Sequence, residues 1–213
     1  MRVVALVPFK SFSYAKTRLR SRFSDAEVAS LGRAMLEDVL HSLVTVPELE
    51  AVRVLTDDEQ VAEVARATGA AARVSRPDPG LNEVIEAANA EALSAGMDAT
   101  LVVLGDLPLL RPEDVQVVVR AGERSGVVLV PSGDGGTAML LRRPPDLIPA
   151  RFGPGSLDEH VAVSRGCGVE PVLIDAIPDA YRLDLDTPED AARILNSGRS
   201  GRTVDVLRKL CSQ

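Results

Sequence analysis

Short apolar segments alternate with amphipathic ones along almost the whole chain, and no other feature of the sequence limits the possible folds as strongly. Segments of the first kind predict buried strands, and segments of the second kind predict helices with one apolar face. A strand, a helix and a further strand in succession form a βαβ unit, whose two strands run parallel. We therefore expect an α/β fold with a mainly parallel, doubly wound sheet. Its strands are expected at residues 3–7, 52–55, 73–75, 100–104, 127–130, 138–141, 172–174 and 182–185.

The segments between these strands carry signals for the starts and ends of helices. Ser24 and Glu27 form a capping box, and apolar residues at 28, 31, 35, 39 and 43 give the helix that follows one buried face. A second capping box predicts that Ser156 is the N-cap of its helix. Thr187 and Pro188 are typical of the cap and first position of another helix. Further helices are expected from about residues 58, 83 and 112, and a short one at 204–210.

Length and composition agree with a single domain over residues 1–213. Domains commonly have one to two hundred residues, and 46% hydrophobic residues suffice for a sizeable core. Aromatic residues make up only 3% of the chain and Trp is absent, so the core must consist of aliphatic side chains. Such cores suit buried parallel strands. Residues from about 197 to 213 are rich in Gly, Ser and Arg at first, and we expect a C-terminal tail with a short helix there.

Charge and cysteine content exclude several classes of function. The formal charge of −7 argues against a nucleic acid partner, because binding the phosphate backbone requires a basic surface. Cys167 and Cys211 lack the spacing of a zinc site or a disulfide framework, so two reduced thiols in a cytoplasmic protein are expected. The N-terminal apolar run is too short for a signal peptide or a membrane span, so no membrane partner is expected.

Residues that directly follow the strands should carry the chemistry, because doubly wound sheets bind ligands beyond the carboxyl ends of their strands. The loop after the first strand contains Lys10, Lys16 and Arg18, three cations in an otherwise acidic chain. They can neutralise the phosphates of a nucleoside triphosphate. The alternative is an ordinary solvated basic loop. Neither a Walker A loop nor a dinucleotide-binding glycine pattern is present.

Three aspartates follow apolar strand-like segments and predict a metal site. Asp106 comes directly after the run 100–104, with Gly105 allowing close approach of the backbone. Asp184 and Asp186 are two residues apart, so on a strand they would point to the same side. Mg²⁺ favours a few carboxylates together with phosphate oxygens and water. The alternative for Asp186 is that it only assists the helix cap at Thr187.

Two glycine-rich turns are candidates for binding a second, anionic substrate. The first, residues 133–137, ends with the hydroxyl of Thr137, and the second, residues 151–156, contains Gly153 and leads to Ser156 at a helix start. Helix N-termini attract anions through unpaired N–H groups and the helix dipole. Plain turns are an equally good explanation of each segment alone. His41 and His160 have no serine or cysteine nucleophile pattern beside them, which argues against a hydrolase triad.

In their order along the chain these motifs resemble the CofC/FbiD family of guanylyltransferases in coenzyme F420 biosynthesis. The motifs are Pro8-Phe9-Lys10, Ala15-Lys16-Thr17-Arg18-Leu19, Pro79-Gly80-Leu81-Asn82, Leu104-Gly105-Asp106-Leu107-Pro108, Gly136-Thr137, Arg151-Phe152-Gly153-Pro154-Gly155-Ser156 and Asp184-Leu185-Asp186-Thr187-Pro188.

The resemblance implies a GT-A-like nucleotidyltransferase fold and the transfer of GMP from GTP to a small phosphorylated acid, with release of pyrophosphate. The acids used in the family are phosphoenolpyruvate, 2-phospho-L-lactate and 3-phospho-D-glycerate. The resemblance also implies the site residues. Asp106, Asp184 and Asp186 would hold Mg²⁺, and Lys16 and Arg18 would contact the GTP phosphates, to which the position of Lys10 in the same loop adds a third nucleotide-binding cation. Asn82 would lie near the guanine, and Thr137, Gly153 and Ser156 would hold the acid. Lys16, Arg18 and Asp106 form the expected catalytic set.

Ala138 favours phosphoenolpyruvate as the acid, because lactate-type enzymes of the family tend to carry Asn after the Gly-Thr pair. The transferase that acts next in F420 biosynthesis is a candidate partner, and the sequence is silent on oligomeric state. Two other functions stay open at this point. One is a GT-A glycosyltransferase that uses a nucleotide sugar, and the other is a nucleotide-binding module without catalytic activity.

Overall fold

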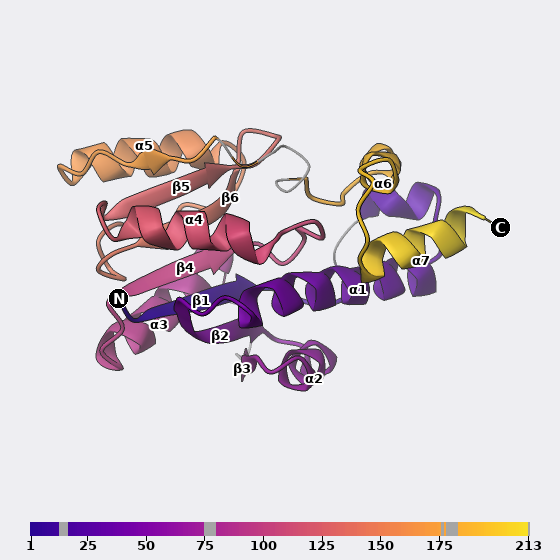
Figure 1. The fold of residues 1–213 in the computed structure, drawn as a ribbon, viewed down its shortest axis with the longest axis horizontal. Helices are drawn as coiled ribbons and strands as arrows, with labels where there is room; N and C mark the ends of the chain where they lie inside the picture. Colours follow the sequence, from indigo (N-terminus) through magenta and orange to yellow (C-terminus); the bar gives the residue numbers. More distant parts are fainter. Residues whose placement is uncertain (13–16, 75–79, 176, 178–182, 213) are drawn as a thin grey trace.

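The computed structural model describes residues 1–12, 17–74, 80–175, 177 and 183–212. Within these residues the backbone forms a seven-stranded sheet in the order β3-β2-β1-β4-β6-β5-β7 (Figure 1). β6 runs antiparallel to β4 and to β5, while the other neighbouring strands are paired in parallel. The expected mainly parallel sheet is therefore confirmed. The strands are β1 (Val3–Pro8), β2 (Leu49–Thr56), β3 (Ala71–Val74), β4 (Ala99–Val103), β5 (Val127–Pro131), β6 (Thr137–Arg142) and β7 (Val172–Leu173).

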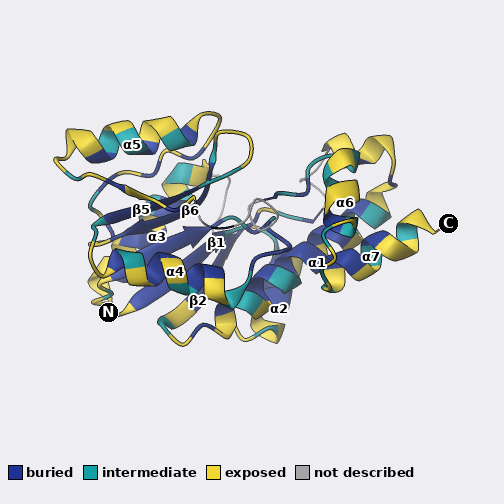
Figure 2. Cartoon of the chain, turned by 45° about the horizontal axis from the view of Figure 1, so that its top comes forward, coloured by how far each residue is buried: buried dark blue, intermediate teal, exposed yellow. Residues whose placement is uncertain are grey.

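Helices cover both faces of this sheet, as the doubly wound pattern predicts. Alternation along β1 places Val3, Ala5 and Val7 in one apolar cluster and Val4 and Leu6 in another. The first cluster includes apolar residues of α1 (Asp25–Val44), α2 (Glu59–Ala67) and α4 (Pro112–Gly122). The second includes residues of α3 (Leu81–Ser94), and α5 (Ser156–Gly166) packs against it. Figure 2 shows the buried strands between helices whose outer surfaces are exposed.

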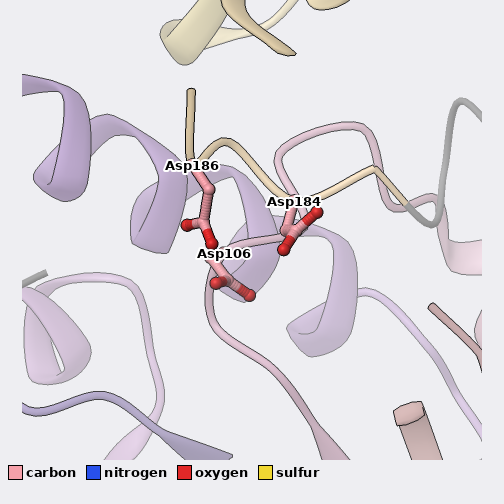
Figure 3. Close-up of side chains that lie close together, drawn as sticks. All are labelled: Asp106, Asp184 and Asp186. Carbon is pink, nitrogen blue, oxygen red and sulfur yellow. The ribbon is translucent and has the colours of Figure 1, made fainter. Parts of the chain in front are cut away.

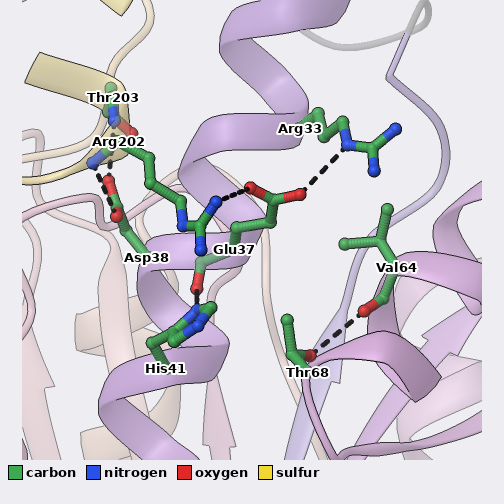
Figure 4. Close-up of polar contacts among 8 residues, drawn as sticks. All are labelled: Arg33, Glu37, Asp38, His41, Val64, Thr68, Arg202 and Thr203. Carbon is green, nitrogen blue, oxygen red and sulfur yellow. Dashed lines mark hydrogen bonds and ion pairs between the residues drawn. The ribbon is translucent and has the colours of Figure 1, made fainter. Parts of the chain in front are cut away.

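The last two helices return to the beginning of the chain. α6 (Pro188–Leu195) contacts α7 (Arg202–Cys211), and α7 packs against α1 at some distance from the sheet (Figure 1). Gly201 precedes α7 and has no side chain to cap it. The carboxylate of Asp38 on α1 instead accepts hydrogen bonds from the backbone N–H groups of Arg202 and Thr203, at 2.9 and 2.8 Å (Figure 4). A residue of α1 thus supplies the missing cap and fixes the C-terminal helices to it.

Most of the expected helix starts are found. Ser24 caps α1 in a complete capping box, and Thr187 caps α6 with Pro188 at its first position. The prediction for Ser156 is wrong, because Gly155 is the N-cap of α5 and Ser156 is its first residue. Gly155 has a φ of 70°, in the left-handed region that glycine adopts without steric cost, and the Ser156 hydroxyl contacts Thr137 instead of the helix backbone.

The predicted strand at 182–185 is also wrong in the part that can be compared. Residue 182 lies outside the described residues, and residues 183–185 have no strand partner. The remaining elements are a short 3-10 helix, η1 (Thr17–Ser21), and irregular connections. Among the described residues, none of the helices is both long and apolar enough to cross a membrane.

Candidate active site

Asp106 lies in the turn after β4, at the edge of the sheet where the parallel strands end. Close packing with the end of β1 explains why glycine precedes it. A Cβ atom at Gly105 would lie only 2.7 Å from Cδ2 of Phe9 and 3.3 Å from Cγ1 of Val7. The absence of a side chain at Gly105 therefore lets the turn that carries Asp106 approach β1 and hold the carboxylate at the end of the sheet.

Asp184 and Asp186 lie on the segment that leads into α6. Buried Leu183 and Leu185 alternate with these two half-buried aspartates, so the extended alternation that the sequence predicted is present although no strand forms. The segment is held at its end by Asp190. Its carboxylate accepts hydrogen bonds from the backbone N–H of Thr187 at 2.9 Å and from the Thr187 hydroxyl at 2.8 Å. Asp190 therefore completes the helix cap at Thr187, the role that was the alternative for Asp186.

The three predicted metal ligands come together in space. Asp106, Asp184 and Asp186 each offer a carboxylate oxygen, and these oxygens lie within 4.8 Å of one another. Figure 3 shows the side chains turned toward a common point, from the turn after β4 and from the segment before α6. All three are partly buried. Three carboxylates at this spacing repel one another, and a small divalent cation that prefers oxygen ligands matches both their chemistry and their charge.

A cleft of about 450 Å³ opens beside two of these acids. Arg18 of η1 and Arg193 of α6 bring positive charge to it, so cations and carboxylates face the same space. Arg193 lies 3.7 Å from the half-buried Asp190, and most of the Arg193 side chain stays open to solvent. Phosphate groups accompanied by a cation suit this mixture of charges. The lining residues are Arg18, Ser132, Gly133, Asp134, Leu183, Asp184, Asp186, Thr187, Asp190 and Arg193.

The loop between β5 and β6 forms one wall of the cleft and is fixed by its own acid. The Asp134 carboxylate accepts hydrogen bonds from the Ser132 hydroxyl and from the backbone N–H of Gly136, the latter at 3.0 Å. These two bonds, that from Ser132 first, lower the pKa of Asp134 below its ordinary value. Asp134 therefore stays ionised at neutral pH and holds the loop that leads directly to Thr137.

Thr137 and Ser156, predicted to bind the acid, are in contact. Their hydroxyl oxygens lie 3.3 Å apart, and Nδ1 of His160 lies 3.0 Å from the Thr137 hydroxyl oxygen. All three side chains are at most 2% exposed. Gly153, the third predicted residue, has a φ of 144°, and its carbonyl oxygen accepts a hydrogen bond from the Ser156 N–H at 3.1 Å. The two glycine-rich turns thus meet at one place, beside the start of α5.

Asn82 takes part in the same region through the backbone. Its side-chain amide donates to the carbonyl oxygen of Phe152 at 3.1 Å, and its amide oxygen accepts from the Phe152 N–H at 2.8 Å. The start of α3 is thereby tied to the turn that contains Gly153. The prediction that Asn82 lies near a guanine base stays a prediction, and the described contacts give this side chain a role in holding the turn.

The predicted basic loop is placed in part. Lys10 is exposed directly after β1, and its carbonyl oxygen accepts a hydrogen bond of 2.8 Å from the Thr56 hydroxyl at the end of β2. Arg18 is exposed and lines the cleft. Lys16 lies outside the described residues. Two strand ends and η1 therefore bring Lys10 and Arg18 to the same edge of the sheet as the three acids.

Comparison with known proteins adds a decisive observation. Residues 1–213 match the protein family described as "Guanylyl transferase CofC like". This chain belongs to that guanylyl transferase family.

Relatives of this guanylyl transferase carry names that differ in the acid. Phosphoenolpyruvate guanylyltransferase of Sphaerobacter thermophilus is 34% identical over 96% of this chain and 98% of its own. 2-Phospho-L-lactate guanylyltransferase of Methanothermobacter thermautotrophicus is 31% identical over 99% and 92%. 3-Phospho-D-glycerate guanylyltransferase of Phenylobacterium zucineum is 38% identical over 93% and 92%. All three relatives are named guanylyltransferases but for three different acids, so the comparison leaves the choice of acid open.

The fold of this guanylyl transferase agrees with its family. A crystal structure from Desulfovibrio desulfuricans, described as a nucleotide-diphospho-sugar transferase, superimposes with a TM-score of 0.81 at 20% identity. It covers 100% of this chain and 96% of the other. At such a low identity the similarity supports only the fold, which is the GT-A-like nucleotidyltransferase fold that the motifs predicted.

Sequence reasoning missed several residues of this site. Arg193, Asp190 and Ser132 line the cleft but stand in segments that were interpreted as a helix and a turn. His160 was considered only as a member of a catalytic triad, and its contact with Thr137 crosses from α5 to β6. The three aspartates were predicted because they directly follow strand-like segments. Arg193 and His160 lie within helices and have no comparable position in the sequence pattern.

Proposed function

We propose that this guanylyl transferase transfers GMP from GTP to phosphoenolpyruvate and releases pyrophosphate. The observation that carries the proposal is the convergence of Asp106, Asp184 and Asp186 beside a cleft that also contains Arg18. Acids that can hold a divalent cation and cations that can contact phosphates are the two requirements for binding a nucleoside triphosphate. Family membership supports GTP as the nucleotide.

The reaction needs no general base. A phosphate oxygen of the acid is already an anion at neutral pH, and it attacks the α-phosphorus of GTP. A bond between that oxygen and the α-phosphorus forms, while the bond from the α-phosphorus to the bridging oxygen of the β-phosphate breaks. Pyrophosphate leaves with the electron pair of the broken bond. The protein has to align the two substrates and neutralise charge that several phosphates bring together.

Each part of the site has a role in this proposal. Asp106, Asp184 and Asp186 would hold Mg²⁺, which neutralises phosphate charge when it is bound. Arg18, with Lys10 and Lys16, contacts the GTP phosphates and stabilises the departing pyrophosphate. The turn that Asn82 holds through the Phe152 backbone would face the guanine. The neighbouring Thr137, Gly153 and Ser156 bind the acid through the hydroxyl pair and the N-terminus of α5, whose dipole favours anions.

The choice of phosphoenolpyruvate rests on the name of the Sphaerobacter relative and on the Gly136-Thr137-Ala138 pattern. The geometry does not strengthen the argument from Ala138. This residue is fully buried in the larger apolar cluster, whereas Thr137 contacts Ser156 and His160 of α5, the helix that packs against the other cluster. Ala138 is therefore not part of the wall around the Thr137–Ser156 pair, contrary to the expectation from the sequence.

A competition experiment tests the proposal. Purified protein, GTP and Mg²⁺ are incubated with equimolar phosphoenolpyruvate, 2-phospho-L-lactate and 3-phospho-D-glycerate, and the guanylylated acids are resolved by mass spectrometry. Pyrophosphate release is followed in parallel, with GTP alone as the control. We expect the phosphoenolpyruvate product to dominate. If the product of another acid dominates, that acid replaces phosphoenolpyruvate as the proposed acceptor and guanylyl transfer still stands. If pyrophosphate release does not depend on any acid, the proposal is refuted.

The product joins GMP to an acid through a reactive phosphoanhydride, so a transferase that consumes it is the proposed partner.

A further inference from the structure

His160 is a buried histidine whose proton can be assigned from its two contacts. It lies on α5 and has no exposed surface. The backbone N–H of Arg151 is 2.9 Å from Nε2, and a backbone N–H can only donate, so Nε2 is the acceptor and carries no proton. The proton of the neutral ring is therefore on Nδ1, which lies 3.0 Å from the Thr137 hydroxyl oxygen. His160 donates to Thr137 across that contact.

The surroundings of the ring keep it neutral. Burial lowers the pKa of His160 to about 4 and the positive charges of Arg142 and Arg151 lower it as well, while a hydrogen bond from the ring to the Ser156 backbone, which shares the Nδ1 proton with Thr137, opposes them. The Phe152 ring packs edge-on against the imidazole, with 5.0 Å between ring centroids. A second proton on Nε2 would also point at the Arg151 N–H. At neutral pH the ring thus stays in the form that donates from Nδ1.

The hydrogen bond from His160 determines where the hydroxyl protons of Thr137 and Ser156 can be donated. Thr137 and Ser156 have two hydroxyl protons, and the 3.3 Å contact between their oxygens uses one of them. Because His160 already donates to Thr137, the second proton cannot be directed to the imidazole. Among the residues that the structure describes, no acceptor takes this second proton. The pair is therefore left with one hydroxyl proton to donate, which suits an anionic oxygen and not a donor group.

We propose that His160 is a positioning residue that fixes the Thr137–Ser156 hydroxyl pair as a hydrogen-bond donor to an anionic oxygen of the acid acceptor. The inference rests on the proposed function, because it assigns the acid to this pair. His160 itself contacts neither substrate nor reacting atoms, and it acts through Thr137. The class of ligand that it selects is a carboxylate or phosphate oxygen, and a neutral hydroxyl in the same place would lack the charge that strengthens such a bond.

Two substitutions separate the two contacts of the ring. In His160→Asn the amide nitrogen can take the place of Nδ1, so the donor to Thr137 is kept. In His160→Gln the longer side chain can place its amide oxygen at Nε2, so the acceptor for Arg151 is kept and the donor to Thr137 is lost. Phosphoenolpyruvate binding is measured by calorimetry with GTP absent, and KM values for both substrates are measured by pyrophosphate release. Thermal unfolding shows whether each variant is folded.

We expect His160→Gln to weaken phosphoenolpyruvate binding by about three- to tenfold, the value of one hydrogen bond, with an unchanged KM for GTP. His160→Asn should bind like wild type. Thr137→Val removes the hydroxyl, so adding His160→Gln to it should cause no further loss. Equal losses in the Asn and Gln variants, or full additivity with Thr137→Val, would overturn the inference.

The tautomer of His160 gives a readout that does not depend on activity. Nitrogen-15 NMR of the imidazole distinguishes protonation at Nδ1 from protonation at Nε2, and we expect Nδ1–H in the wild-type protein at pH 7. An Nε2–H signal would overturn the inference even if guanylyl transfer is found. Absence of guanylylated acid with wild-type protein would instead refute the proposed function, and with it the assignment of the acid to this pair, while an Nδ1–H signal would still support the direction of donation from His160 to Thr137.

Discussion

Replacing Asp106 or Asp186 with asparagine should change stability and activity in different directions. The carboxylate oxygens of Asp106, Asp184 and Asp186 lie within 4.8 Å of one another. Two unit charges at this distance repel by about 1 kcal/mol in water and by about 3 kcal/mol at the effective dielectric constant near a protein surface. One neutral side chain removes two of the three repulsions. Without divalent cation, each variant should therefore be as stable as wild type or more stable by about 1 kcal/mol, which is roughly 2–4 °C in Tm.

Turnover should fall in the same variants. A cation that neutralises phosphate charge contributes several kcal/mol to the transition state, and each 1.4 kcal/mol corresponds to about tenfold in rate. The loss of one carboxylate ligand should thus lower kcat by at least about a hundredfold. Mg²⁺ should raise the Tm of wild type, because it binds the folded state and relieves the repulsion there, and should raise the Tm of the variants much less.

The assay combines thermal unfolding in chelator and in Mg²⁺ with pyrophosphate release at saturating Mg²⁺. Glu63→Gln is the matched control, because Glu63 is an exposed carboxylate on α2 and its neutralisation should leave all these values unchanged. Wild-type turnover by both aspartate variants, or an undiminished Mg²⁺ stabilisation, would refute the assignment of these acids to a metal. A variant that loses its fold without cation would contradict the repulsion argument.

Three further predictions concern the rest of the site. Lys16→Ala and Arg18→Ala should each lower kcat/KM for GTP by at least about tenfold in steady-state kinetics, with thermal stability within about 0.5 kcal/mol of wild type; normal kinetics would make these residues ordinary solvated cations. Because the pKa of His160 is about 4 when folded and near 6.5 when unfolded, its contribution to stability is complete above pH 6.5 and is lost as the pH falls toward 4. Urea unfolding should show a loss of up to about 3 kcal/mol over this range that His160→Asn lacks, and parallel curves would contradict it. Gly105→Ala places a Cβ 2.7 Å from a ring carbon and should cost about 1–3 kcal/mol in urea unfolding, whereas Gly133→Ala, with no atom within 4 Å, should not; equal costs would exclude the steric explanation.

Much of the fold could be predicted because strands and helices leave different periods in the sequence. The helix α1 shows the period well, with apolar residues at 28, 31, 35, 39 and 43, whereas β1 was found as a short continuous apolar run, which fits a strand whose five apolar residues divide between the clusters on its two faces. Ser24 and Glu27 marked the start of α1 because a capping box is a local interaction between residues three positions apart. The prediction that Ser156 caps its helix failed because the Ser156 hydroxyl contacts Thr137. Thr137 is distant in the sequence, so a local pattern does not contain this contact.

The site could be predicted where it depends on the ends of strands. Asp106 follows the most obvious buried strand, and the alternation of Leu183 and Leu185 with acids indicated a common direction for Asp184 and Asp186. Contacts that depend on which elements are neighbours could not be predicted. His160 meets Thr137 because β6 runs antiparallel within the sheet and α5 packs beside it, and a periodic pattern does not contain that arrangement.

The cap that Asp38 provides to α7 has a consequence for the order in which the protein becomes active during synthesis. A ribosome releases Asp106 and the strands β1 to β6 before the segment with Asp184 and Asp186. That segment is anchored through α6 to α7, which docks on Asp38 of a helix made near the beginning. Asp106 is therefore made before the other two acids, and all three can meet only once that segment has been released. We therefore expect nucleotide turnover only after α7 has left the ribosome and packed against α1.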